Sequence, residues 1–370
     1  MKRTTIFLAA LALVAASCTK TEVVSDKTQD SVKGIGFSAY TSRPTKTAQE
    51  DVTTEKLSSF QVTAIGNNAV YFDDVTFNKS NVWESDTKYF WPAYALTFCA
   101  YNTPTKGTFT RNITEEAQTL TFSPSTKLAE QEDLVVAYAE NKKETDATDP
   151  YSSLPLTFKH YLTQVIVKAK NSSSTYTVTV DGVKLANFKN QGTYTFSTKE
   201  MVADDSKTNY TANFTKVTLN NTPQEVMTDA NNGRWYLVPQ SVTAWAQANE
   251  STNTSKGTYL ALKVKITANN GALKIYPATG EDSAWMAIPV SSSEIGFVQG
   301  HKYTITVNFF STESGATSGG AGYVDPEEPG DLDGNASTND AGKKIIGGVI
   351  KFNATVDDWS SNSHDITIEL

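Results

Sequence analysis

The chain has 370 residues, enough for about two domains of ordinary size. Its 40 acidic residues outnumber its 32 basic residues, and the formal net charge of −8 argues against nucleic acid and anionic membrane surfaces as partners. With only two cysteines, the chain cannot build a framework of disulfides. Aromatic residues make up 11% of the sequence, so a packed hydrophobic core is the expected source of stability.

The first segment has the layout of a secretory signal peptide. Lys2 and Arg3 give it a positive start, and residues 6–16 form an apolar run. That run is too short for a membrane-spanning helix, which needs about 20 apolar residues. Small residues then lead directly to Cys18. The sequence therefore predicts that residues 1–17 are a signal peptide.

Cys18 is the predicted site of lipid attachment. The run Ala15-Ala16-Ser17-Cys18 resembles the lipobox of bacterial lipoproteins, in which the cysteine thiol is acylated and the chain is cut just before it. Ala15 departs from the leucine that is usual there, so ordinary signal cleavage without acylation is the alternative. Lipidation explains better why a lone cysteine stands at the cut, and two or three acyl chains anchor a domain firmly. Residues 18–33 are polar and predict a flexible tether.

From Val32 onward, apolar and polar residues alternate with a period of two. This alternation places one face of a strand on a core and the other in water, which is typical of antiparallel sheet. Since no window beyond the signal peptide favours an amphipathic helix, we predict an all-β fold. Cys99 lies within one such run and is expected to be a buried small apolar residue. The clearest runs lie at residues 35–39, 165–169, 176–180, 260–266, 303–309, 350–356 and 366–370.

The strands fall into two predicted domains. Residues 141–155 are charged and then rich in serine and proline, and they separate two strand-rich halves. We place an N-terminal β-sandwich at 34–153 and a C-terminal β-sandwich at 154–370. A long segment at 311–342 is rich in Gly, Ser, Asp and Pro, and loops of this length are usually functional or disordered.

Sites of chemistry are few. The run Asp331-Leu332-Asp333-Gly334-Asn335 resembles a calcium loop, but glycine stands at the fourth position where an EF-hand has its glycine at the sixth. A solvated acidic loop is favoured, and calcium binding at 331–340 stays open. The three histidines have no metal-ligand spacing, and the sequence has no Gly-x-Ser-x-Gly motif. We expect no catalytic residues, no metal site, no cofactor and no enzymatic activity.

The six tryptophans allow two interpretations. They could stack on sugar rings at an exposed surface, or they could fill the cores of the sandwiches. Because they are spread singly through the predicted strands, the core interpretation is favoured. The residues concerned are Trp83, Trp91, Trp235, Trp245, Trp285 and Trp359.

Seven groups of residues occur in a characteristic order along the chain. They are Ile35–Ala39 with Thr45–Ala48, Tyr89–Pro92 with Leu96–Tyr101, Glu132–Ala137, Leu156–Val165, Tyr236–Gln240, Phe297–Tyr303 and Val356–Trp359. Each is short, but together they resemble the fimbrillin family, the type V pilin-like (Mfa-like) surface lipoproteins of Bacteroides-type bacteria.

This resemblance implies two tandem antiparallel β-sandwiches, the first of them transthyretin-like. It also implies a structural subunit or accessory component of surface fimbriae that acts in adhesion. Such a protein is exposed at the cell outer membrane through its lipid anchor. Its implied partners are other fimbrial subunits, and a ligand on a host or bacterial surface. The alternative is a non-polymerising surface lipoprotein that binds glycans through exposed aromatic residues.

The resemblance further implies a route to polymers. A protease cuts after Lys or Arg beyond the first strand, and a terminal strand of the next subunit fills the groove that is left. The bond between Lys46 and Thr47 is the candidate for cleavage. The candidate donor strand carries Ile366, Ile368 and Leu370 on one face. The same tail could equally be an ordinary last strand of its own sheet.

Overall fold

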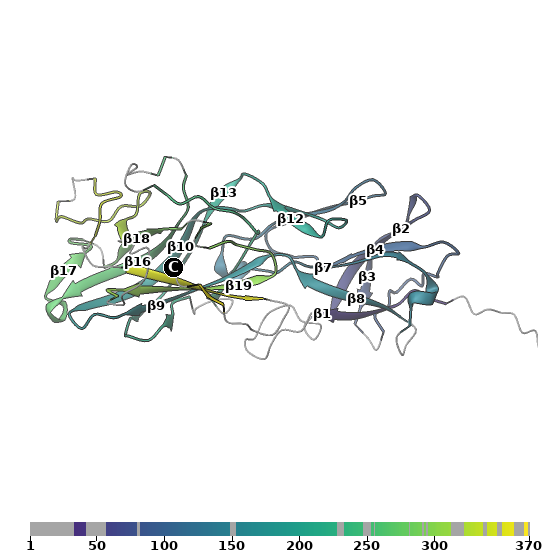
Figure 1. The fold of residues 1–370 in the computed structure, drawn as a ribbon, viewed down its shortest axis with the longest axis horizontal. Coiled ribbons are helices and arrows are strands. Elements are labelled where there is room, and N and C mark those ends of the chain that lie inside the picture. The colour runs from purple at the N-terminus through teal and green to yellow at the C-terminus, as the bar shows by residue number, and fades with distance from the viewer. Residues whose placement is uncertain are drawn as a thin grey trace, which may run out of the picture. The chain divides into compact units, whose positions relative to one another are not determined.

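A computed structural model describes the chain over residues 33–41, 57–79, 82–148, 153–227, 233–246, 253–254, 256–280, 282–290, 292–293, 295–311, 322–335, 339–345, 350–358 and 366–368. The chain divides into two compact units, residues 1–33 and residues 34–370, and the strands belong to the second. Within the described ranges the helices are 3₁₀ turns of three residues, at Leu128–Glu130, Glu144–Asp146 and Asn269–Gly271. The predicted all-β fold is confirmed (Figure 1).

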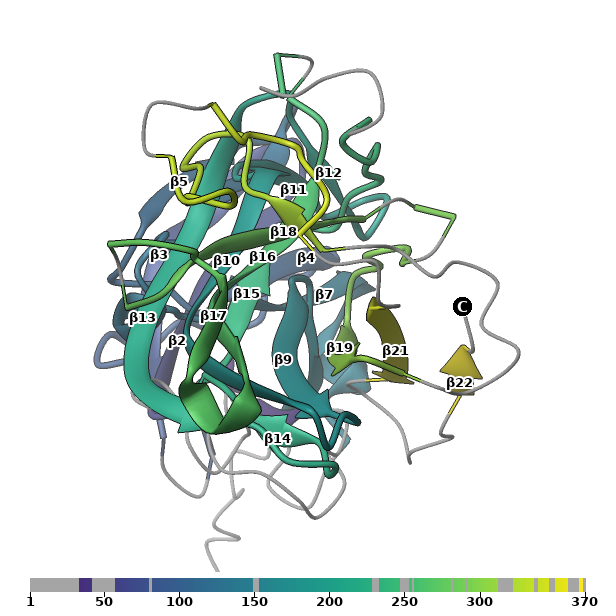
Figure 2. The same cartoon turned by 90° about the vertical axis from the view of Figure 1, so that its left-hand side faces the viewer.

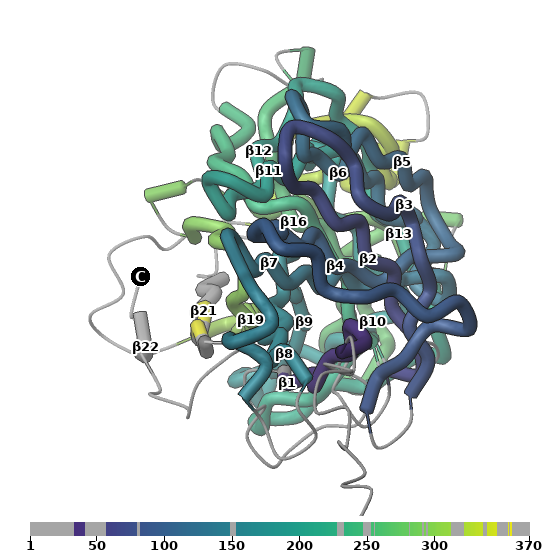
Figure 3. The backbone as a smooth tube through the Cα atoms, turned by 90° about the vertical axis from the view of Figure 1, so that its right-hand side faces the viewer, coloured from purple at the N-terminus to yellow at the C-terminus, as the bar shows by residue number. Residues whose placement is uncertain are grey.

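The first sheet has six strands. They run in the order β1 (Phe37–Thr41), β8 (Leu154–His160), β7 (Val135–Lys142), β4 (Leu96–Tyr101), β2 (Ser59–Gly66) and β3 (Ala69–Asn78). Figure 3 shows β4 between β2 and β7. Neighbouring strands are antiparallel, except that β1 pairs in parallel with β8. One face of the sheet covers a core that is rich in phenylalanine.

A four-stranded sheet follows, with strands from distant parts of the sequence. Its order is β12 (Glu200–Ala203), β11 (Gly192–Thr195), β6 (Gln118–Ser123) and β5 (Thr108–Ile113). A second core lies between this sheet and β4 and β7, and it includes Cys99, Tyr101, Leu120 and Tyr194. Strands from before and after residue 154 therefore share one sheet.

Two further sheets enclose the largest core. One runs β13 (Lys207–Thr218), β10 (Tyr176–Lys189), β16 (Tyr259–Ala268), β18 (Ala284–Pro289) and β20 (Tyr323–Val324), with β17 (Leu273–Tyr276) beside β16. The other runs β14 (Gln224–Glu225), β9 (Thr163–Asn171), β19 (His301–Phe309), β21 (Ile350–Asp358) and β22 (Ile366–Ile368), with β15 (Trp235–Leu237) beside β9. Alternate residues of both sheets meet in one apolar cluster, which makes a sandwich (Figure 2).

The predicted division of the chain at residues 153 and 154 stays a prediction. Strand pairing favours a boundary several residues later, because β8 begins at Leu154 and completes the first sheet between β1 and β7. The segment predicted as a long irregular loop contains β20, whose Val324 is buried. Part of that segment is therefore packed structure.

Candidate functional site

The first strand is held at the edge of its sheet by main-chain hydrogen bonds. Besides its pairing with β8, the Ile35 N–H donates to the carbonyl of Tyr89 at 2.7 Å. Phe37 and Trp83 exchange two such bonds, at 3.1 and 2.8 Å. The strand β1 and the residues just before it thus pair with β8 on one side and make isolated main-chain contacts with Trp83 and Tyr89 on the other.

The side chains of β1 alternate between core and solvent. Phe37 is fully buried, with its ring centroid 4.7 Å from that of Phe77 and 5.3 Å from that of Phe98. Both pairs are edge-to-face, the geometry that aromatic rings prefer. Tyr40, on the same strand, is 52% exposed. A single edge strand therefore supplies a central ring of the phenylalanine core.

The predicted assembly residues are placed only in part. Cys18, Lys46, Thr47 and Leu370 lie outside the described residues. Ile366 and Ile368 belong to β22, which pairs antiparallel with β21 at the edge of its sheet. The tail is thus seen as the last strand of its own sheet, and its role as a donor stays a prediction.

The tryptophans are core residues wherever the structure describes them. Trp83, Trp91, Trp235, Trp245 and Trp285 are each at most 7% exposed, so none of these five rings offers a face to a sugar. Trp359 lies outside the described residues. The core interpretation is confirmed for five positions, and they give the glycan-binding alternative no support.

Two side chains of types that often take part in reactions are also buried. His160 places Nδ1 2.5 Å from Oδ2 of Asp133, and both side chains are 1% exposed, so this histidine is bonded within the core. Cys99 is fully buried, and burial raises the pKa of its thiol. Because the thiolate is the reactive form, Cys99 is inert, in agreement with its predicted role as a small apolar residue.

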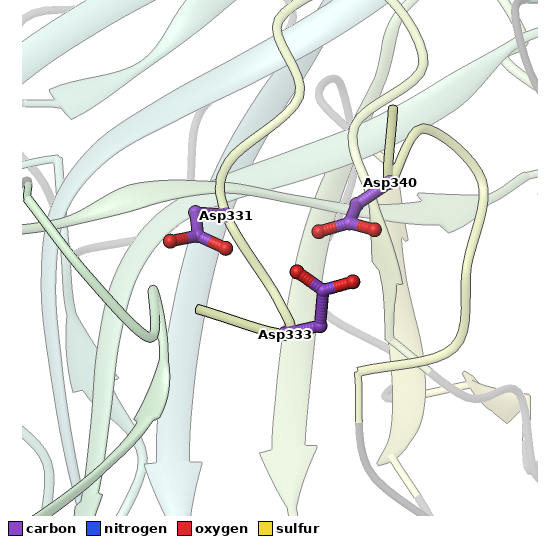
Figure 4. Close-up of side chains that lie close together, drawn as sticks. All are labelled: Asp331, Asp333 and Asp340. Carbon is purple, nitrogen blue, oxygen red and sulfur yellow. The ribbon is translucent and has the colours of Figure 1, made fainter. Parts of the chain in front are cut away.

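Three carboxylates converge in the acidic loop. Asp331, Asp333 and Asp340 each offer an oxygen within 4.8 Å of the others (Figure 4). Oxygen ligands of this kind suit calcium. Much of their capacity is already used, because Lys343 Nζ lies 2.7 Å from Asp340 Oδ1, and backbone N–H groups bond Asp340 Oδ2 and Asp331 Oδ1. The ammonium group of Lys343 therefore supplies positive charge beside these carboxylates. This favours the interpretation as an acidic loop without a metal.

The predicted calcium-like run contained Asp331 and Asp333, whereas Asp340 was included only as the last residue of the 331–340 loop. Burial alone would raise the pKa of Asp340, but the hydrogen bonds from Lys343 and from the Leu332 N–H outweigh it and lower that pKa. Asp340 is thus kept ionised beside its lysine. In the sequence, the only sign of this ion pair was the short spacing between Asp340 and Lys343. Such spacings of acidic and basic residues are common on protein surfaces.

The sequence matches the family model described as fimbrillin-like over residues 21–320. The chain belongs to the fimbrillin-like family. This is a family of structural proteins, so the chain is a non-enzymatic protein, as the sequence predicted. Comparison with curated proteins finds no match. None of the described helices is long and apolar enough to cross a membrane.

One solved structure shares the fold of this fimbrillin-like protein, and two others are less similar to it. The chain is similar to a fimbrial protein from Bacteroides vulgatus ATCC 8482, with a TM-score of 0.54 and 15% identity over 88% of this chain and 99% of that one. For a candidate cell adhesion protein from Parabacteroides distasonis ATCC 8503, the TM-score is 0.47 and the identity is 9%, over 90% of this chain and 98% of that one. For another from Bacteroides uniformis ATCC 8492, the TM-score is 0.44 and the identity is 14%, over 88% of this chain and 98% of that one. The first likeness agrees with the all-β fold.

Proposed function

We propose that this protein is a structural subunit or accessory component of bacterial surface fimbriae that acts in adhesion. It is exported as a lipoprotein, anchored in the outer membrane through Cys18, and joined to other fimbrial subunits. Membership of the fimbrillin-like family and the fold shared with a fimbrial protein support this function. The acidic net charge and the buried tryptophans favour protein partners over nucleic acid or sugar.

The observation that carries the assembly route is the position of β1. It lies at the end of the strand order, and its sheet partner is β8. Its loss would expose the edge of β8 and the apolar slot that Phe37 fills. An open sheet edge beside an apolar slot accepts an extended strand, because main-chain bonds supply affinity and alternate side chains fill pockets.

Cleavage between Lys46 and Thr47 would make β1 exchangeable. The bond lies between β1 and β2, so cutting it leaves β1 attached to the N-terminal tether and separates it from the rest of the chain. The terminal strand of a second subunit then takes its place. Because donor and acceptor are different surfaces, the contact is head-to-tail and propagates a fibre.

Filaments sheared from the cell surface are expected to contain a form whose first residue is Thr47. Edman sequencing or mass spectrometry of the filament protein gives the result directly. Lys46→Gln should abolish this form and the filaments. Arg43→Gln is the matched control, since Arg43 precedes Pro44 and should resist trypsin-like cleavage. Filaments whose subunits begin only at Cys18 would contradict the cleavage route.

Cys18→Ala is expected to remove the lipid anchor. The variant should lose incorporation of labelled fatty acid and appear in the soluble fraction, because a thiol is needed to accept the acyl chains. Cys99→Ala, which changes the other cysteine, should leave both labelling and membrane retention unchanged. Unchanged membrane retention of the Cys18 variant would refute lipidation at this site.

A further inference from the structure

Lys184 is a lysine buried on the outer face of a sheet. It lies in β10 between Val183 and Leu185, which point into the main core, so Lys184 points the opposite way. Its side chain is nevertheless only 1% exposed. An aromatic cluster that includes Tyr259 and Trp285 surrounds it on that face. The chain that follows β20 completes the cover.

The carboxyl group of Asp325 meets this lysine. Asp325 follows β20 and its side chain is fully buried, with Oδ2 2.8 Å from Lys184 Nζ. Its other oxygen, Oδ1, accepts three hydrogen bonds, from the hydroxyl of Tyr259 at 3.2 Å and from the N–H groups of Glu327 and Glu328 at 2.8 and 2.9 Å. A second carboxylate, Oε1 of Glu328, lies 2.8 Å from the same lysine nitrogen.

These contacts provide the parts that amide formation requires. An amine is fixed against a carboxyl group, and such fixed geometry greatly accelerates reaction between two groups. Three donors surround Oδ1, where negative charge develops when a nucleophile attacks the carbon. Burial raises the pKa of Tyr259, so its hydroxyl remains a donor. Glu328 is half-exposed and can exchange protons.

We propose that Lys184 and Asp325 join in an intramolecular amide bond in the folded chain. Nζ passes one proton through Oε1 of Glu328, its hydrogen-bond partner at 2.8 Å, to Oδ2 of Asp325, giving an amine and a carboxylic acid. The amine then attacks Cγ, and the charge on Oδ1 is held by its three donors. Glu328 takes a second proton from Nζ and delivers it to the departing Oδ2, which leaves as water. The product carries one N–H, no net charge changes, and no other reactant is needed.

The bond would replace a costly ion pair. Two charges removed from water pay a desolvation penalty that their attraction repays only with excellent geometry, whereas an amide is neutral. It would also tie β10 covalently to the chain beyond β20, across the aromatic outer face. When a subunit is pulled along its length, the segment after β20 then could not detach from β10. The inference stands independently of the polymerisation route.

Mass spectrometry of the full purified chain tests the bond. The intact mass is expected to be lower by one water, about 18 Da, than the mass calculated for the same N-terminus. Protease digestion should yield one branched peptide in which Lys184 and Asp325 are linked. Recovery of the two peptides separately, with the intact mass at its calculated value, would overturn the proposal and leave a plain ion pair. This measurement needs no variant and does not depend on fibre assembly.

Variants then assign the roles. Lys184→Met should restore the lost water after correction for the substitution. Lys343→Met is the matched control, because Lys343 also pairs with an aspartate, at 2.7 Å, but is 48% exposed, and the water should remain lost. Glu328→Gln should slow linkage, so that freshly folded protein contains an unlinked fraction. Linkage in that variant at the wild-type rate would refute the proton transfer by Glu328.

Discussion

Phe37→Ala is expected to lower the free energy of unfolding by about 3–5 kcal/mol, the usual cost of truncating a buried aromatic side chain. Phe37 is fully buried and makes edge-to-face contacts with two phenylalanine rings. The substitution would leave a cavity in the centre of the phenylalanine core, because the surrounding rings are held by their own strands. Urea unfolding of the purified chain, before any cleavage, measures the loss.

Tyr40→Ala is the matched control for that measurement. Tyr40 lies on the same strand and is more than half exposed, so its truncation should change the free energy of unfolding by about 0.5 kcal/mol or less. If both variants lost the same amount, the side chain of Phe37 would not be a core contact, and the slot ascribed to β1 would not exist.

The burial of Phe37 also sets the energetics proposed for assembly. A subunit that loses β1 without a replacement loses this ring and the pairing with β8, so the open form is unstable. An incoming strand regains both kinds of interaction, and the gain favours the fibre. In the proposed route, the contacts that stabilise the precursor would also be those that an incoming strand restores after cleavage.

Local patterns predicted the strands well but not their partners. The alternation of Ile35, Phe37 and Ala39 predicted a strand with one buried face, and Phe37 is fully buried. The same alternation does not say which strand lies alongside, or in which direction. The parallel pairings of β1 with β8 and of β9 with β19 were missed for this reason. They join segments far apart in the sequence.

The buried polar groups could not be predicted from local sequence. Lys184 stands between two apolar residues, which in an alternating strand indicates a solvent-facing position. It is buried because a segment more than a hundred residues later covers that face and brings Asp325 to it. Asp340 likewise stands several residues after Asp331 and Asp333, and its carboxylate nevertheless lies within 4.8 Å of theirs. Sequence patterns show the face of a strand but not what covers it.

Deletion of residues 366–370 is expected to abolish polymerisation and to leave the subunit folded. β22 pairs with β21 over three positions at the edge of its sheet, so its loss should lower the free energy of unfolding by about 1 kcal/mol or less, because short terminal elements contribute little to global stability. If this tail is the donor strand, subunits that lack it cannot fill the slot of a neighbour, and filaments should be absent by electron microscopy. Urea unfolding of the deleted chain separates loss of assembly from loss of fold.

A finer pair of variants distinguishes the donor face from the mere presence of a tail. Ile366→Asn combined with Ile368→Asn changes two residues that alternation places on one face, and Thr367→Asn changes the residue between them. The double variant should stop assembly, because alternate side chains fill the pockets of the acceptor, whereas the Thr367 variant should assemble normally. Filaments of normal length from the double variant would assign the tail to its own sheet alone, since β22 would then contribute only its pairing with β21.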